Sequence, residues 1–365
     1  MPSAAESPLI ERIRAAAADG SPLRIRGGGT KDFYGEAPLG ELLETSALAG
    51  VTSYEPTELV VTVGAGTPLA ELEALLAVQG QCLPFEPPHF GAGATVGGMV
   101  ATGLSGPARA SVGAMRDYVL GMTIINGRGE ALSFGGTVMK NVAGYDVSRL
   151  VAGSLGTLGL ITEVSLKVLG VAPAEATLKF EFGQAQALDQ LNRWGGQPLP
   201  LNASCWVEDA GVGTLYLRLR GAVAAVAAAC LKLGGERPDN AQVAPDWSLC
   251  REQQLPWFAE CGERELWRLS VPQTAPVLDL PDAPLIEWHG GQRWVRTAPG
   301  QGERLRQVAR EAGGHATLFR PGAFTAATTQ RFAAPSPVLQ RIHRELKRQF
   351  DPAGVFNRGR LYPDF

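Results

Sequence analysis

The sequence predicts an α+β protein of two domains, and three observations support this. Between residues 23 and 169, short apolar strands run repeatedly into glycine-rich turns. After Val171-Ala172-Pro173 the pattern changes to two rounds of strand and helix, which predict helices on one face of a mainly antiparallel sheet. The chain has 365 residues, enough for two domains of ordinary size.

The first domain is predicted to begin with a short helix and then a strand, Leu23–Arg26, that runs into Gly27. A strand over 59–63 precedes a helix that begins near Pro68 and ends at Gly80. The remaining predicted strands are 118–125, 130–134 and 160–168.

The second domain is predicted to contain both rounds, and a last helix follows it. The predicted strands are 178–182, 204–207, 214–219, 265–271, 316–319 and two short ones near Ile286 and Trp294; the predicted helices are 184–194, 222–233, 247–261, 303–312 and 337–350. We place the domains at 1–170 and 171–334, with residues 335–365 returning to the first domain.

Composition excludes several classes of protein. Hydrophobic residues make up 45% and charged residues 19%, as in a globular chain with a buried core. A net charge of −3 gives no basic field for nucleic acid. The five cysteines form no CxxC pair, so we expect no zinc ribbon and no iron–sulfur cluster in this chain. The odd cysteine count and the lack of a secretion signal suggest reduced thiols and a cytoplasmic location, and no segment has the length of a membrane span.

One motif imitates a dinucleotide-binding fingerprint. Gly64-Ala65-Gly66 follows a strand and opens a helix, and Glu86 lies about twenty residues further on. The third glycine position is occupied by Leu69, where a glycine is needed for close packing of helix against strand. We therefore reject a Rossmann domain, and the absence of a GxxxxGK[ST] motif excludes a P-loop.

Four glycine-rich segments share one explanation. They are 26–31 (RGGGTK), 93–103 (GATVGGMVATG), 105–109 (SGPAR) and 153–162 (GSLGTLGLIT). Successive backbone N–H groups in turns form concave anion sites, and glycine lets them approach a diphosphate without a side chain in the way. Each segment alone could be an ordinary tight turn, but all four in one chain predict a nucleotide-cofactor site.

These segments, in this order, resemble the vanillyl-alcohol-oxidase-type or PCMH-type FAD-binding family, over about residues 23–169. The resemblance implies an FAD-binding domain of two α/β subdomains and a cap domain with an antiparallel sheet. The tail Phe350–Arg360 is similar to the ending of the hydroxyacid dehydrogenase branch. More narrowly, residues 139–150 (MKNVAGYDVSRL) resemble the FAD-binding subunits of bacterial glycolate oxidases, also called glycolate dehydrogenases.

The resemblance also implies roles for individual residues. The loop Gly27–Lys31 would hold the FAD diphosphate, the segment around Thr95 would line its opposite side, and Ile161 would contact the adenosine part. Thr30 stands where some relatives attach FAD through a histidine, so non-covalent binding is expected. The full predicted cofactor-binding set is Arg26, Gly27, Gly28, Gly29, Thr30, Lys31, Ala94, Thr95, Val96, Gly97, Gly98, Thr102, Ser105, Gly106, Arg109, Gly156, Ile161 and Asn357.

The substrate side departs from the family pattern. Larger hydroxyacid dehydrogenases of this branch carry a histidine-rich metal motif, roughly HxGDGNxH, and this chain has only four isolated histidines. We therefore expect no metal site. An arginine fork suits a carboxylate, so Arg268, Arg293 and Arg320 are candidates for binding a substrate anion, although a surface or structural salt bridge is the more common role of such an arginine. No catalytic residue is predicted.

The resemblance implies an FAD-dependent oxidoreductase that acts on the CH–OH group of glycolate or a related 2-hydroxy acid and passes electrons to an iron–sulfur subunit. The implied partners are that subunit and a larger FAD-containing catalytic subunit, in a complex peripheral to the membrane with no span in this chain. Two alternatives stay open. The chain could be a non-catalytic FAD-binding or electron-relay subunit, or a free-standing D-2-hydroxyacid oxidase.

Overall fold

The computed structural model describes residues 4–137, 145–209, 211–259, 261–363 and 365. Contacts divide the chain into two compact units. The first unit comprises Met1–Leu104, Ala114–Gly170 and Ala334–Phe365, and the second comprises Ser105–Gly113 and Val171–Ala333. The predicted continuous segment 1–170 differs from the first unit at one place, because Ser105–Gly113 groups with the second unit. As a division into folding domains, the predicted boundaries stay a prediction.

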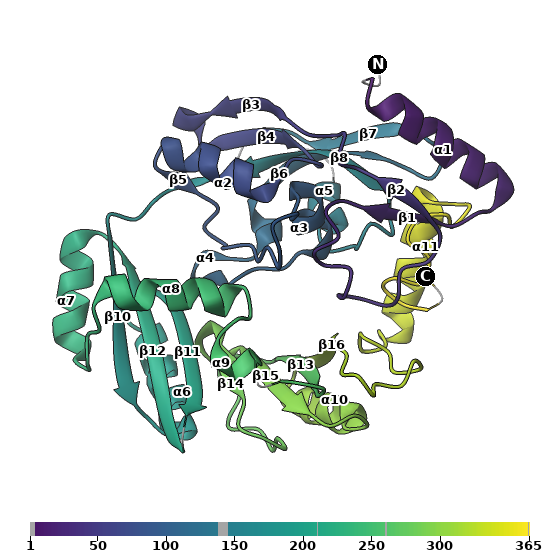
Figure 1. Cartoon of the computed structure of the whole chain (residues 1–365). Helices are drawn as coiled ribbons and strands as arrows, with labels where there is room; N and C mark the ends of the chain where they lie inside the picture. Colours follow the sequence, from purple (N-terminus) through teal and green to yellow (C-terminus); the bar gives the residue numbers. More distant parts are fainter. Residues whose placement is uncertain (1–3, 138–144, 210, 260, 364) are drawn as a thin grey trace. The chain divides into compact units, whose positions relative to one another are not determined.

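The first unit is built around a five-stranded sheet (Figure 1). Its elements are α1 Glu6–Asp19, β1 Leu23–Arg26, β2 Glu41–Glu44, β3 Val51–Glu55, η1 Pro56–Glu58, β4 Val60–Gly64, α2 Leu69–Val78, β5 Gln81–Cys82, α3 Val96–Thr102, η2 Met115–Tyr118, β6 Val119–Ile125, β7 Ala131–Gly135, α5 Val147–Val151, β8 Leu160–Lys167, β9 Leu169–Gly170 and α11 Pro337–Phe350.

The order β3-β4-β8-β6-β7 decides against a Rossmann domain. Strand β4, which carries the imitation motif, pairs antiparallel with both β3 and β8. A Rossmann fingerprint needs a parallel β-α-β unit. The rejection of that reading is therefore confirmed. Strands β1 and β2 form a separate parallel pair, Leu23–Arg26 against Glu41–Glu44, which fixes the loop that follows β1.

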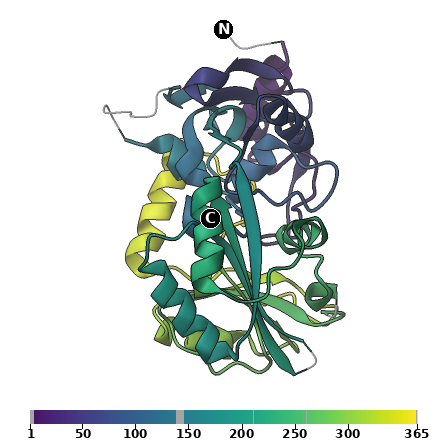
Figure 2. The same cartoon turned by 90° about the vertical axis from the view of Figure 1, so that its left-hand side faces the viewer.

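The second unit contains a seven-stranded sheet in the order β10-β12-β11-β14-β15-β13-β16, with every pairing antiparallel. Figure 2 shows the long strands β10, β11 and β12 side by side. Its elements are α4 Arg109–Val112, β10 Ala174–Glu181, α6 Gln184–Gly195, β11 Leu201–Asp209, β12 Val212–Gly221, α7 Val223–Leu233, α8 Asn240–Arg251, α9 Pro256–Ala259, β13 Glu265–Ser270, β14 Leu285–Glu287, η3 Trp288–Gly290, β15 Gln292–Thr297, α10 Gly302–Glu311 and β16 His315–Arg320.

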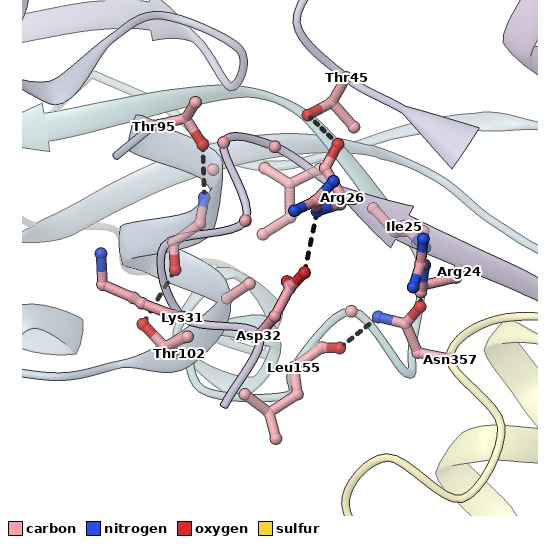
Figure 3. A pocket seen from close by; sticks show the side chains of 18 of the residues that line it. Arg24, Ile25, Arg26, Lys31, Asp32, Thr45, Thr95, Thr102, Leu155 and Asn357 are labelled. Carbon is pink, nitrogen blue, oxygen red and sulfur yellow. Dashed lines mark hydrogen bonds and ion pairs between the residues drawn. The ribbon is translucent and has the colours of Figure 1, made fainter. Parts of the chain in front are cut away.

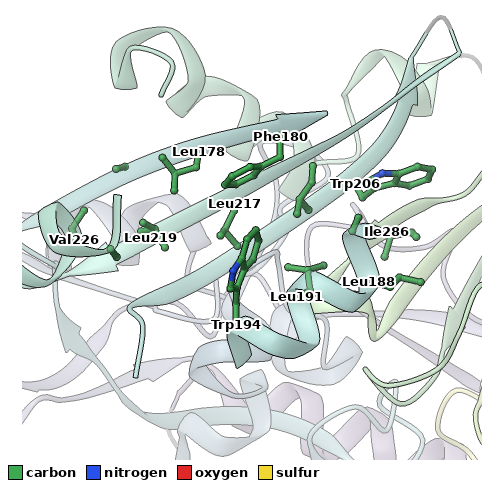
Figure 4. Close-up of a cluster of buried hydrophobic side chains, with 14 residues drawn as sticks. Leu178, Phe180, Leu188, Leu191, Trp194, Trp206, Leu217, Leu219, Val226 and Ile286 are labelled. Atoms are coloured by element: carbon green, nitrogen blue, oxygen red, sulfur yellow. The ribbon is translucent and has the colours of Figure 1, made fainter. Parts of the chain in front are cut away.

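The predicted α+β class is confirmed by this large antiparallel sheet. Helices α6 and α7 bury Leu191, Trp194 and Val226 against Leu178 and Leu217 of the sheet (Figure 4). Helix α10 buries Leu305 and Ala309 in a second cluster with Trp267. Fully burying such side chains stabilises the fold by roughly 1.5–3 kcal/mol each.

One predicted helix is wrong in extent. The structure has two helices, α8 and α9, where the sequence predicted a single one over 247–261. Helix α8 begins at Asn240, where the side chain of Asp239 accepts a hydrogen bond from the Ala241 N–H. Pro256 begins α9, and a proline fits the first turn of a helix because its missing N–H would have no partner there.

Candidate FAD site

A cavity in the first unit collects residues from most of the predicted glycine-rich segments (Figure 3). From the predicted set, its lining contains Arg26, Gly27, Gly28, Gly29, Thr30, Lys31, Thr95, Gly97, Gly98, Thr102, Gly156, Ile161 and Asn357. Lining residues that the sequence analysis missed are Arg24, Ile25, Asp32, Pro38, Thr45, Ala65, Ala101, Leu155, Gly159 and Arg360.

The loop Gly27–Thr30 presents its main chain to this cavity. None of these four N–H groups donates a hydrogen bond to a described residue. A Cβ added at Gly28 would overlap the carbonyl oxygen of Gly93, and one added at Gly27 would overlap the hydroxyl of Thr95. Two segments far apart in sequence therefore touch backbone to backbone here. Successive free amides of this kind suit an anion such as a diphosphate.

Helix α3 forms the wall next to this loop. Thr95 accepts a 3.2 Å hydrogen bond from the Gly98 N–H and so caps the helix. Gly97 passes close to β4, because a Cβ there would lie 2.8 Å from the Cβ of Ala65. The hydroxyl of Thr102 donates to the Gly98 carbonyl at 2.9 Å. This wall is therefore built from glycines and from threonines bonded within the helix, and it places no bulky side chain beside the amide loop.

The C-terminal tail closes the cavity through Asn357. Its side-chain oxygen accepts from the Ile25 N–H at 2.8 Å, and its side-chain nitrogen donates to the Leu155 carbonyl at 2.6 Å (Figure 3). Asn357 itself has a φ of 39°, a conformation that asparagine tolerates better than most residues. The tail thus joins strand β1 to the turn at Gly156.

A buried ion pair holds that tail in place. The ammonium of Lys347 donates to Asp351 at 2.8 Å and to the carbonyls of Thr157 and Phe356 at 2.7 and 2.8 Å. Asp351 also accepts from the N–H groups of Val355 and Phe356. Burial lowers the pKa of Lys347, and the neighbouring Asp351 carboxylate opposes this. Helix α11 is thereby tied to the turn that contains Gly156.

The cavity carries an excess of positive charge. Its lining contains Arg24, Arg26, Lys31 and Arg360 against one carboxylate, Asp32. Asp32 pairs with Arg26 at 2.9 Å, and Lys31 donates to the His89 carbonyl at 3.1 Å. Arg24 forms no hydrogen bond or ion pair with a described residue, and its Nε atom is buried. Arg24 and Arg26 stand two residues apart on β1, so they share a face of the strand, and this alternation could have identified Arg24 from sequence.

Five predicted cofactor residues do not line the cavity. Ala94 and Val96 are buried. Ser105, Gly106 and Arg109 belong to the second unit. There the Gly106 carbonyl accepts from the Trp288 indole at 3.0 Å, and the Arg109 guanidinium lies 4.5 Å from the centre of that ring. This segment is thus engaged by residues about 180 positions later in the chain.

His289, the residue after Trp288, is also buried in the second unit and is 9% exposed. Its ring nitrogens lie 2.9 Å from the Ser111 hydroxyl and 3.1 Å from the Ser204 hydroxyl, and its backbone N–H donates to Ser204. Burial lowers the pKa of His289 to about 4. The imidazole is therefore neutral at neutral pH.

This burial predicts an acid sensitivity of the second unit. Because the unfolded histidine titrates near its ordinary pKa of 6.5 and the folded one near 4, stability is full above 6.5 and falls as the pH drops toward 4, by about 3 kcal/mol in total. Urea unfolding of the parent and of His289→Asn across this range measures it. The variant should lose part of the pH dependence of its free energy of unfolding. If that free energy falls by the same amount between pH 7 and pH 4.5 in the variant and in the parent, the burial of neutral His289 is not the cause of the acid sensitivity.

The three arginines proposed for a substrate anion differ in their surroundings. Arg293 is fully buried and donates to the carbonyls of Gly290 and Ala275 at 2.8 and 3.2 Å, and burial lowers its pKa to about 10. Arg320 donates to Gln253 at 3.2 Å, and burial lowers its pKa to about 10 as well. Arg268 lies 5.6 Å from the Phe319 ring. Arg320 lies 5.8 Å from the same ring, so Arg268 and Arg320 are near one aromatic side chain, and all three arginines stay candidates.

Other features bear on metals, thiols and membranes. Within the described ranges, no group of three or more His, Cys, Asp or Glu side chains could hold a metal ion. None of the five cysteines, all of which the structure describes, forms a disulfide bond. Over the same part of the chain, no helix is both long and apolar enough to cross a membrane.

Comparison with known proteins adds to this geometry. Residues 4–149 match the family model described as an FAD binding domain. The glycolate oxidase subunit GlcE of Escherichia coli (strain K12) is 46% identical over 357 residues, which cover 98% of this chain and 97% of that one. The glycolate oxidase subunit GlcD of Bacillus subtilis (strain 168) is 32% identical over 160 residues, 43% of this chain and 34% of its own. The solved structure of an alkyldihydroxyacetonephosphate synthase superposes with a TM-score of 0.64 at 16% identity, covering 96% of this chain and 73% of that one, which supports the fold alone.

The fold, the amide-lined cavity and the matched domain define a flavoprotein oxidoreductase with a PCMH-type FAD-binding domain. Within this class, the chain belongs to the family of the glycolate oxidase subunit GlcE.

Proposed function

We propose that this chain is the FAD-binding subunit of a glycolate oxidase or dehydrogenase complex. It binds FAD without a covalent link. When bound, FAD supplies the oxidation of the CH–OH group of glycolate or a related 2-hydroxy acid to the 2-oxo acid. The partners are a larger FAD-containing subunit and an iron–sulfur subunit that receives the electrons. The complex is cytoplasmic and peripheral to the membrane through its other subunits.

The observation that carries this proposal is the free amide loop Gly27–Thr30 in a chain that is 46% identical to a glycolate oxidase subunit. The amides would hold the diphosphate, and Arg24, which has no acidic partner among the described residues, would balance part of its negative charge, since Arg26 is already paired with Asp32. Asn357 orients the main chain of Ile25 and Leu155 at the cavity wall. Thr30 offers no histidine ring for covalent attachment, which supports non-covalent binding.

A second candidate is an FAD-binding subunit without catalysis of its own. The burial of Arg293 and its two bonds to carbonyl oxygens favour this reading, because that guanidinium is already occupied by the fold. Such a subunit would stabilise the complex or relay electrons.

Flavin absorbance separates these possibilities. We expect the purified chain to bind added FAD and to release it into the supernatant on acid precipitation. Bleaching of the flavin band by glycolate or D-lactate supports catalysis, whereas a bound but unbleached flavin supports the second candidate. Arg24→Gln should weaken FAD binding about tenfold or more, since a hydrogen bond to a charged group contributes roughly 1.5–3 kcal/mol. The exposed Arg128→Gln, outside the cavity, should have no effect. A chain that refuses FAD would refute the proposal.

A further inference from the structure

The second unit contains a cavity of about 400 Å³ that has no role in the site described above. Strands β11, β12 and β14 form one side and helices α8 and α9 the other. Pockets of roughly 300–1,000 Å³ are the usual size for small-molecule sites. The lining residues are Cys205, Val207, Glu208, Tyr216, Val243, Asp246, Trp247, Cys250, Leu255, Pro256, Trp257 and Leu285.

The aromatic walls are held in fixed positions. The indole N–H of Trp247 donates to the Thr177 hydroxyl at 3.0 Å, and the Arg218 guanidinium lies 4.8 Å from its ring centre. The Arg296 guanidinium lies 4.3 Å from the ring centre of Trp257. These contacts restrict both rings, so the cavity is preformed rather than created by side-chain movement.

The two charged side chains that line this cavity are both acidic, whereas Arg218 and Arg296 only contact the rings of its aromatic walls. Glu208 at the end of β11 and Asp246 on α8 are exposed, and neither forms a hydrogen bond or ion pair with a described residue. The lining contains no Lys, Arg or His, and none of Arg268, Arg293 and Arg320 belongs to it. A cavity that carries charge of one sign concentrates ions of the opposite sign. It therefore disfavours glycolate and other hydroxy acid anions.

The floor of the cavity is neutral and weakly polar. Cys205 and Cys250 are both buried, and the Cys250 thiol donates to the Glu287 carboxyl at 3.2 Å. Its hydrogen bond with Cys205, together with burial, raises the pKa of the Cys250 thiol well above the ordinary value. The Cys250 thiol therefore stays protonated, and the two cysteine side chains contribute a soft apolar surface to the cavity.

We propose that this cavity binds a small organic cation, namely an ammonium group carried on an aromatic or branched aliphatic body. Trp257, Val207 and Leu285 would contact the apolar body, while Glu208 and Asp246 attract the charge. The inference stands on the second unit alone and does not depend on the flavin.

Three probes with the same aromatic body test the sign of the charge. Isothermal titration calorimetry of the full chain with 2-phenylethylammonium, 2-phenylethanol and 3-phenylpropionate should give binding in that order, with the carboxylate weakest. Equal binding of ammonium and carboxylate, or no binding of the ammonium, would overturn the proposal.

Variants locate the binding. Glu208→Gln combined with Asp246→Asn should weaken ammonium binding about tenfold, as expected for two solvent-exposed charges. Val207→Phe should weaken it by placing a phenyl ring where the apolar body of the ligand would lie. Glu181→Gln removes an exposed carboxylate outside the lining and should leave affinity unchanged. Ammonium binding with the parent's affinity in Val207→Phe, in a variant that unfolds like the parent, would place the ligand elsewhere and refute the inference.

Discussion

Replacement of Gly28 by alanine is expected to weaken FAD binding about a hundredfold or more. Gly28 is not among the glycines with a positive φ, so the expected effect comes from the space that a Cβ would need. A Cβ there would overlap the main-chain carbonyl of Gly93, and a carbonyl cannot move as a side chain can. The two loops must separate, which disrupts the free amides of Gly27–Thr30. Overpacking of this kind costs roughly 1–3 kcal/mol, and more when backbone meets backbone. Titration of the apoprotein with FAD, followed by fluorescence, measures the loss.

Two glycines supply matched controls. A Cβ at Gly93, the other partner in the contact, would lie 3.3 Å from the Gly28 carbonyl oxygen, so Gly93→Ala should cost far less affinity. A Cβ at Gly170 meets nothing within 4 Å, so Gly170→Ala should bind FAD like the parent. Circular dichroism of all three separates local from global damage. If Gly28→Ala binds FAD as tightly as Gly93→Ala, the amide loop is not the diphosphate site.

The different effects expected for alanine at Gly28 and at Gly93 show what could and could not be predicted from the sequence. Glycine clusters predicted that amides would face a ligand, and Gly27–Lys31, Gly97 and Gly156 line one cavity. Which glycine is irreplaceable depends on a contact between residues 65 positions apart, and no local pattern contains that information. Likewise, Thr45 and Arg360 reach the cavity through the parallel pairing of β1 with β2 and through the returning tail.

Residues that are close in sequence can also lie at different sites, because each is held by contacts with distant parts of the chain. Thr102 lines the cavity, whereas Gly106 accepts a hydrogen bond from Trp288 in the second unit. The two glycine-rich segments 93–103 and 105–109 are separated by a single residue, so the predicted cofactor set includes residues from both. The antiparallel sheet was predictable from alternating strands, but the break between α8 and α9 required the geometry at Pro256.

Substitution of Lys347 by methionine is expected to destabilise the first unit by about 3–5 kcal/mol. The pair Lys347–Asp351 is buried, with side chains 11% and 0% exposed, and removal of one partner leaves the other charge uncompensated. Methionine is a good helix former of similar length, so the helix itself should persist. The carbonyls of Thr157 and Phe356 also lose their donor. Urea denaturation measures the free energy of unfolding.

A neighbouring pair on the same helix provides the control. Arg348 and Glu345 form an exposed ion pair, with side chains 68% and 53% exposed, so Arg348→Ala should change stability by less than about 1 kcal/mol. The double variant Lys347→Met/Asp351→Asn should recover part of the loss, because no buried charge is then left unpaired. FAD affinity should fall in Lys347→Met but not in Arg348→Ala, since only Lys347 bonds the carbonyl of Phe356, the residue before Asn357. Equal stability of the two single variants would mean that the tail is held by apolar packing of Val355 and Phe356 rather than by the buried pair.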